Sequence, residues 1–104
     1  MRMILFFDLP TITSSNKRDY RKFHAFLIKE GFIMLQYSVY IKLAINKSVT
    51  KQVVSRLEKN KPADGSIILM EITEKQFNDM TWLIGKRSDN VLDTTTKTVF
   101  YDEE

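Results

Sequence analysis

Residues 2–9 of the chain read RMILFFDL and are followed directly by Pro10. Apolar side chains occupy both parities of this run, which is rich in Ile and Phe. A strand with one face in water would alternate apolar and polar residues, so the run predicts a central strand that is covered on both faces. The rest of the fold is expected to assemble around this strand.

A helix is predicted to follow the strand. Residues 11–16 (TITSSN) supply several potential N-cap residues, and Gly31 suits the position just after a helix, so the helix is expected over Ser15–Glu30. At 100° per residue one stripe is apolar and the opposite side is basic: Tyr20, Phe23 and Leu27 against Arg18, Lys22 and Lys29, with Arg21 at the flank of the basic side. One face of this helix therefore belongs to the core, and the other is a basic ridge.

Residues 32–44 (FIMLQYSVYIKLA) form an apolar stretch that is too long for one typical strand. We interpret them as two strands, or one bent strand, with a break near Gln36 and Tyr37. Helical periodicity returns over Asn46–Asn60. Its inward positions are Val49, Val53 and Leu57, and its outward positions include Lys47, Lys51, Glu58 and Lys59.

Residues 66–72 (SIILMEI) predict another apolar strand, preceded by a turn at residues 61–65. Thr73 and Gln76 form a T-x-x-Q capping box for a short helical turn. Residues 82–84 are expected to continue the core, and Thr98–Tyr101 to form a last short strand. The predicted order, β-α-β-β-α-β with an appended C-terminal strand, is the ferredoxin-like plan of an α+β fold.

Length and composition limit the function classes. A chain of 104 residues has room for one domain, expected over residues 1–104. Hydrophobic residues make up 43% and charged residues 28%, and no apolar run reaches the length of a membrane span, which excludes disorder and membrane insertion. The first residues do not form a signal peptide and there is no Cys, so a cytoplasmic location is expected. With no Cys and one His, carboxylates are the plausible metal ligands.

Charge is distributed unevenly along the chain. Residues 1–63 hold 12 Lys or Arg and 4 Asp or Glu, a net +8, whereas residues 64–104 hold 4 and 9, a net −5. This asymmetry is typical of a protein with a basic face for a polyanion and an acidic end that avoids it or meets another protein. Solvated surface charge is the alternative interpretation.

Asp8 is the first candidate for chemistry, because a carboxylate at the end of a hydrophobic strand lies at the rim of the sheet. It could hold a metal ion, or it could cap the turn made by Pro10. A Mg²⁺ site typically uses one or two carboxylates with waters and substrate phosphates. A twofold dimer that brings two copies of Asp8 together would meet that need, giving one site for Mg²⁺ or another divalent metal shared across the dimer.

Basic helix faces are the candidates for phosphate contact. One set lies on the first helix and a second on the following helix, and either could equally be an ordinary solvated face. The candidate residues are Lys17, Arg18, Arg21, Lys22, Lys29, Lys47 and Lys51. Repeated across a dimer, they would make a long electropositive track that positions a duplex through its backbone.

Other candidates are weaker. His24 could be a general acid or base, but it is better interpreted as a boundary residue, since the sequence suggests no partner for it. Aromatic residues such as Phe6, Phe7, Tyr37, Tyr40 and Trp82 could stack on bases, yet they lie in apolar runs and are expected in the core.

Three stretches together resemble the CRISPR-associated protein Two family, the small subunit of the spacer-acquisition module. They are residues 1–10 (MRMILFFDLP), the segment YRKF at 20–23 leading into EGF at 30–32, and QYSVY at 36–40. Residues 73–77 (TEKQF) resemble the branch found beside the large single-effector nuclease of type II-A systems. The resemblance covers nearly the whole chain.

The resemblance implies a homodimer in the antiviral spacer-acquisition system. The final strand of each subunit would join the partner's sheet, here through Thr98, Val99, Phe100 and Tyr101. Family members are metal-dependent endonucleases acting on single-stranded RNA or on DNA, and their metal-binding aspartate falls on Asp8. Their basic residues hold duplex DNA by its phosphates, which matches the region from Lys17 to Lys22. The implied partner is the integrase CRISPR-associated protein One, which the dimer bridges.

One departure and three hypotheses remain. Ile41 stands where many members of the family have an acid, so a second acidic contribution from that position is absent. Three functional hypotheses are open. The chain could be a Mg²⁺-dependent endonuclease, or a non-catalytic dimer that positions duplex DNA between integrase subunits. It could also be a single-stranded RNA-binding module that uses aromatic side chains of the sheet.

Overall fold

The structure, a computed structural model, describes residues 1–85 of the 104. Four strands and three helices lie within these residues, in the order β1 Arg2–Asp8, α1 Ser14–Glu30, β2 Ile33–Gln36, β3 Val39–Leu43, α2 Lys47–Asn60, β4 Ser66–Ile72 and α3 Glu74–Asn78. The strands form one antiparallel sheet in the order β2-β3-β1-β4. This mixed α+β arrangement is compatible with the ferredoxin-like plan. The strand predicted at Thr98–Tyr101 lies outside the described residues.

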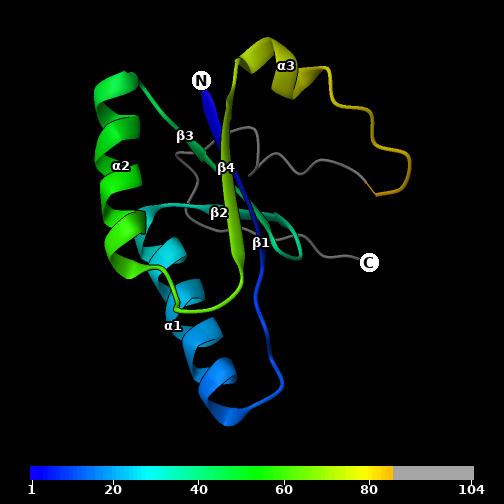
Figure 1. Cartoon of the computed structure of the whole chain (residues 1–104). Coiled ribbons are helices and arrows are strands. Elements are labelled where there is room, and N and C mark those ends of the chain that lie inside the picture. The colour runs from blue at the N-terminus through cyan, green and yellow to red at the C-terminus, as the bar shows by residue number, and fades with distance from the viewer. Residues whose placement is uncertain (86–104) are drawn as a thin grey trace.

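The position of β1 confirms that its apolar run is a central strand, while the predicted cover on both faces is complete on one face only. β1 pairs with β3 on one side and with β4 on the other, with Leu5 opposite both Tyr40 and Leu69. Successive side chains of a strand point to opposite faces. Met3, Leu5 and Phe7 therefore face α1 and α2, which lie together on one side of the sheet (Figure 1).

Residues 1–85 cover the other face of β1 only in part. Ile4 packs with Phe77 of α3 in a second, smaller cluster, and Phe6 lies half-buried at its edge. Arg2 holds α3 in place: its Nε and Nη2 donate to the Glu74 carboxylate at 2.8 and 3.2 Å, and its guanidinium lies 4.5 Å from the centre of the Phe77 ring. We call this incompletely covered side the open sheet face.

Local signals place the ends of the helices where the sequence predicts them. Thr13 caps α1 by accepting from the backbone N–H of Asn16 at 3.0 Å, so the helix begins one residue earlier than expected. It ends at Gly31, whose φ of 98° is a conformation that favours glycine. Asn46 caps α2, and the Thr73–Gln76 capping box opens α3 as predicted.

The predicted break in residues 32–44 is a turn between β2 and β3. Ser38 has a φ of 65°, a left-handed conformation that is uncommon for residues other than glycine, and the β2–β3 register shifts between Met34 and Gln36. The expectation that residues 82–84 continue the core is wrong for Leu83 and Ile84, which are each 91% exposed. They follow α3 on irregular chain, where no strand or helix of the described residues covers them.

None of the helices within residues 1–85 combines the length and the apolar character that a membrane span requires.

Candidate functional site

Asp8 ends β1 and is exposed at the rim of the sheet. Its place two residues after Phe6 puts it on the open sheet face. The alternative role, as a cap of the turn made by Pro10, finds no support, because the Asp8 carboxylate has no hydrogen bond or ion pair with any residue of the described chain. A solvent-facing carboxylate with no competing partner is available to a cation or to a nucleic acid's bound metal.

Gly65 holds the backbone beside Asp8. The two strands pair here with Ser66 opposite Asp8, and Gly65 adopts a φ of 107° just before β4. A Cβ built on Gly65 would lie 2.8 Å from the Asp8 carbonyl oxygen and 2.6 Å from Cδ2 of Leu9. The close approach at the end of β1 therefore requires glycine.

Within the part of the chain that the structure describes, Asp8 is the carboxylate at this end of β1. No group of three or more His, Asp or Glu side chains that could hold a metal occurs within residues 1–85. Asp8 alone falls short of a complete protein cage, but one or two carboxylates with waters and substrate phosphates suffice for Mg²⁺. The donor set thus fits a divalent metal in an arrangement that combines Asp8 with a second carboxylate or with phosphate oxygens.

The predicted basic residues are all exposed, but the fold divides them between two ends of the sheet. α1 begins shortly after Asp8, so Lys17 and Arg18 lie in its first turns at the Asp8 end, followed by Arg21 and Lys22. Lys29 lies in its last turn, about 18 Å along the axis from Lys17 at 1.5 Å per residue.

Lys47 and Lys51 lie at the start of α2, toward the opposite end of the sheet. Just before that helix, Ala44 N–H donates to the carbonyl of Met1 at 2.9 Å. Lys47 also forms an ion pair with Glu71, with 2.8 Å between Nζ and Oε1, and this hydrogen bond is the main reason why the pKa of Glu71 is lowered. The basic residues that lie at the same end of the sheet as Asp8 are therefore those in the first turns of α1, not those of α2.

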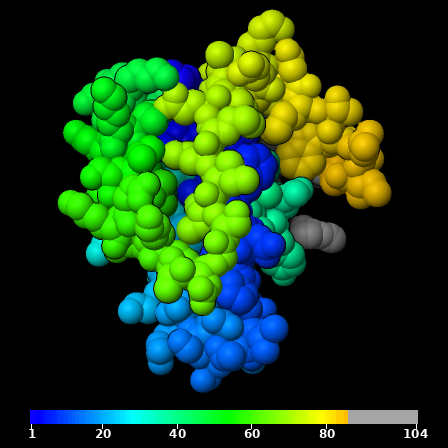
Figure 2. All heavy atoms as spheres, viewed as in Figure 1, coloured from blue at the N-terminus to red at the C-terminus, as the bar shows by residue number. Residues whose placement is uncertain are grey.

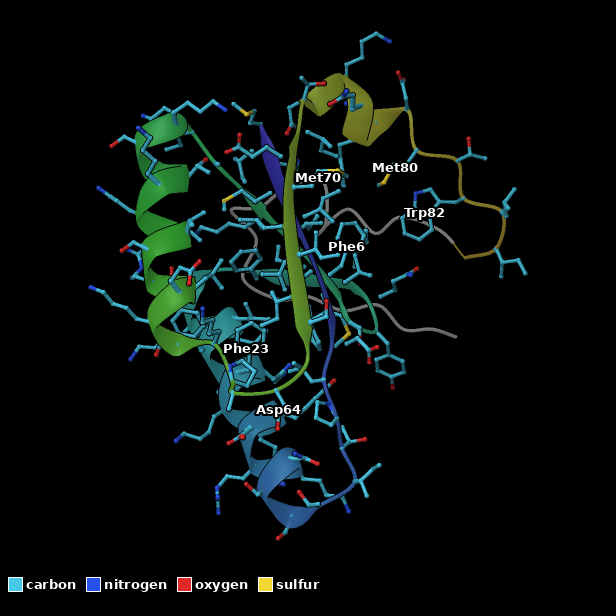
Figure 3. All side chains as sticks on the ribbon, in the orientation of Figure 1. Phe6, Phe23, Asp64, Met70, Met80 and Trp82 are labelled. Atoms are coloured by element: carbon cyan, nitrogen blue, oxygen red, sulfur yellow. The ribbon has the colours of Figure 1, made fainter. Side chains whose placement is uncertain are left out.

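The open sheet face carries an apolar groove of about 590 Å³. Its walls include Phe6 of β1, Met70 of β4, and Met80 and Trp82 from the segment after α3, which Figure 3 shows on the side of β4 away from Phe23. β4 is an edge strand that pairs only with β1 among the described strands, and it lies at the surface between α2 and the residues that follow α3 (Figure 2). The face that carries Asp8 is thus also the one with uncovered apolar surface.

Comparison with known proteins identifies the family of the chain. The model of the family "CRISPR associated protein Cas2" matches residues 1–80. The chain belongs to the Cas2 family. A protein of Streptococcus mutans serotype c named "CRISPR-associated endoribonuclease Cas2" is 47% identical over 103 residues, which are 99% of this chain and 94% of the relative.

Two further Cas2 relatives carry the same name. The one from Ligilactobacillus salivarius is 42% identical, and the one from Treponema denticola is 44% identical. Each match covers 95% of this chain and 98% of the relative. The resemblance stated from the sequence is therefore confirmed.

Burial separates the aromatic residues of this Cas2 chain. Phe7 and Tyr40 face the helices and are buried, as expected, and their rings stack with centroids 5.6 Å apart. The expectation of burial is wrong for Tyr37, which is 84% exposed because it lies in the turn between β2 and β3. Exposure of this ring depends on turn geometry, and the break predicted near Gln36 and Tyr37 was the signal that could have placed it in a turn.

His24 is a half-buried boundary residue, as predicted, but it does have a partner. Its Nδ1 lies 2.6 Å from the hydroxyl of Tyr40. Burial is the main cause that raises the pKa of Tyr40 to about 12, with the neighbouring Tyr20 as a lesser cause. Tyr40 is therefore a protonated phenol at neutral pH, and the pair is better suited to positioning α1 on the sheet than to proton transfer.

Proposed function

We propose that the chain is a CRISPR-associated endonuclease that cleaves RNA as a homodimer and uses Asp8 of both copies to hold one divalent metal ion. The observation that carries the proposal is the position of Asp8: an exposed carboxylate without a partner in the described chain, at the end of the central strand and on the open sheet face. The name shared by the relatives, endoribonuclease, supports the reaction class.

The open sheet face supports the homodimer. Ile68 and Met70 are 59% and 46% exposed on the edge strand β4, and the apolar groove lies beside them. Exposed apolar surface and a seven-residue edge strand without Lys or Pro favour association with another chain. If two such faces meet around a twofold axis, the Asp8 residues that share them approach each other.

A metal held by the two Asp8 carboxylates would be Mg²⁺ or another divalent cation. When bound, it would lower the pKa of a water and stabilise the negative charge that develops on a phosphoryl group. The chain's own part is to present the carboxylates on a rigid strand and to bring Lys17 and Arg18 to the same end, where cations attract the phosphates of a substrate.

Cleavage of labelled single-stranded RNA with Mg²⁺ or with a chelator tests this proposal. Asp8→Asn should abolish metal-dependent cutting, because the neutral amide is a poorer Mg²⁺ ligand than a carboxylate. Asp79→Asn is the matched control, since it makes the same change at an exposed position after α3, at the other end of β4. Cutting that survives Asp8→Asn, or that is lost equally in both variants, would contradict the role of Asp8.

A second function is favoured by the basic ridge of α1. Arg18, Arg21 and Lys22 are exposed along one side of the helix, and phosphate contacts of this kind position a duplex without reading its bases. We infer that the homodimer also binds duplex DNA along this ridge and bridges subunits of the integrase CRISPR-associated protein One during spacer acquisition. The acidic C-terminal end, whose charge does not suit DNA, is our candidate for the integrase contact.

Salt dependence of duplex binding tests the second function. The logarithm of the binding constant falls with the logarithm of the salt concentration, and the slope becomes shallower by about 0.9 for each phosphate contact that is lost. Reversing the charge of Arg18, Arg21 and Lys22 should therefore flatten the slope, whereas Lys75→Glu on α3 should leave it unchanged. A flat slope in the unmodified protein would count against duplex binding, and loss of DNA binding in Asp8→Asn would mean that the two functions are not separable.

The third hypothesis, an RNA-binding module built on sheet aromatics, is the least supported. Such modules stack bases on aromatic side chains exposed at the centre of the sheet. Here Phe7 and Tyr40 face the helices, and Phe6 lies half-buried beside the groove.

A further inference from the structure

Tyr37 is the one exposed aromatic side chain within residues 1–85. Its exposed fraction is 84%, whereas every other Phe, Tyr and Trp of the described chain is buried or half-buried. Large aromatic side chains stabilise a fold mainly through the surface that they bury, and Tyr37 buries little of its own. The ring therefore contributes little to the stability of the subunit, and its surface is free to meet a ligand.

The turn that carries Tyr37 is fixed against the end of β1. Ser38 adopts its left-handed φ of 65°, and its carbonyl accepts from the backbone N–H of Phe7 at 3.0 Å. Antiparallel pairing places Val39 opposite Phe6. The register ends there, and the Phe7–Ser38 hydrogen bond is the last contact between β1 and the turn, with Asp8 and Tyr37 each one residue beyond it.

The metal-ligand candidate and the turn that carries the exposed ring thus lie at the same end of the sheet. Asp8 lies between Ser66, its partner in β4, and the turn that carries Tyr37. The first turns of α1, with Lys17 and Arg18, begin at the same end. A carboxylate, an exposed ring and cations at one end of the sheet match the parts of a nucleotide: its phosphate, through a metal or the cations, and its base, through the ring.

Base stacking is the interaction that such a ring can offer. It tolerates any base, because every base has a π-face, and it requires a base that is not already stacked within a duplex. We infer that Tyr37 stacks on an unpaired base of single-stranded RNA bound at the Asp8 end of the sheet, so that Tyr37 is a positioning residue which favours single strands. This inference rests on the proposed function for the role of Asp8.

Equilibrium binding in the presence of a chelator tests the inference without any need for cleavage. The probes are a short single-stranded RNA carrying a fluorescent base analogue, and the same RNA annealed to its complement. Tyr37→Ala should weaken single-strand binding by about 5- to 150-fold and abolish the quenching of the analogue. Tyr37→Phe keeps the ring and should bind like the unmodified protein, and duplex binding should not change in either variant.

Ile12→Ala is the matched control, because Ile12 is 86% exposed in the loop that follows β1 and offers no ring. It should leave single-strand binding unchanged. Equal single-strand affinity in Tyr37→Ala and the unmodified protein would overturn the inference, and so would no single-strand binding by the unmodified protein. The inference would also be overturned if Tyr37→Phe bound single-stranded RNA as weakly as Tyr37→Ala. It would likewise be overturned if Tyr37→Ala changed the oligomeric state in sedimentation, because the ring would then serve a contact between copies.

The two proposals fail in different ways. If Tyr37→Ala weakens binding but no variant cuts RNA with Mg²⁺, the stacking role stands and the endonuclease proposal is lost. If cutting depends on Asp8 but single-strand binding ignores Tyr37, only the stacking role is lost.

Discussion

Replacement of Gly65 by Ala should destabilise the fold more than the same replacement at Gly31. Both residues have φ near 100°, 107° at Gly65 and 98° at Gly31, so Ala carries a similar conformational cost of about 1–3 kcal/mol at each position. They differ in what the added methyl group meets. At Gly31 it would approach the terminal Nζ of Lys42 at 2.9 Å, which can swing away.

At Gly65 the methyl group would meet the end of β1. It would lie 2.8 Å from the carbonyl oxygen of Asp8, 2.6 Å from Cδ2 of Leu9 and 3.3 Å from the Leu9 Cα. Backbone held in a sheet cannot move aside as a lysine tip can. Overpacking of this kind costs typically 1–3 kcal/mol, so we expect Gly65→Ala to be less stable than Gly31→Ala by about 2 kcal/mol.

Thermal unfolding measures this difference. For a domain of this size, about 2 kcal/mol corresponds to a gap of roughly 8–16 °C in Tm. The two variants should be compared at equal protein concentration, since the Tm of an associating protein depends on it. Equal melting temperatures for Gly65→Ala and Gly31→Ala would refute the reasoning, because they would mean that the end of β1 yields as freely as a side chain.

Three further predictions concern ionisable and apolar groups. The hydrogen bond from Arg2 is the main cause that lowers the pKa of Glu74. The stability that this bond contributes is therefore present above the ordinary carboxyl pKa and is lost as the pH falls through the lowered pKa. In Glu74→Gln, acid unfolding followed by circular dichroism should lack this contribution to the pH dependence of stability. The pKa of Tyr40 is raised from 10.0 to about 12, so the stability of the fold should decline from about pH 10 upward. Tyr40→Phe should show a smaller decline in alkaline melting curves. At neutral pH the same variant should lose about 1 kcal/mol of stability, because it lacks the contact with His24. Ile68→Lys places a charge on the open sheet face and should reduce the homodimer fraction measured by sedimentation. The far-ultraviolet circular dichroism spectrum should stay unchanged. A dimer fraction that is not reduced would argue for another interface.

Much of the candidate site could be predicted before the structure was known, but only one residue at a time. Asp8 follows from its place at the end of an apolar run, and the basic ridge of α1 follows from helical periodicity. The ion pair of Lys47 with Glu71 could not be predicted, because 24 positions separate the two residues. The same is true of His24 and Tyr40, whose contact depends on how α1 packs on β3.

The sequence by itself determined the elements and their ends. Caps such as Thr13 and Gly31, the T-x-x-Q box and the hydrophobic periods act within a few residues, so no distant contact is needed to specify them. The tertiary structure alone decided what lies beside Asp8. The turn that carries Tyr37 is held at the end of β1 by the hydrogen bond between Phe7 and the left-handed Ser38, and β4 reaches Asp8 through the glycine at position 65. These neighbours come from distant parts of the chain, and their meeting depends on the pairing of whole strands, which no local stretch of sequence encodes.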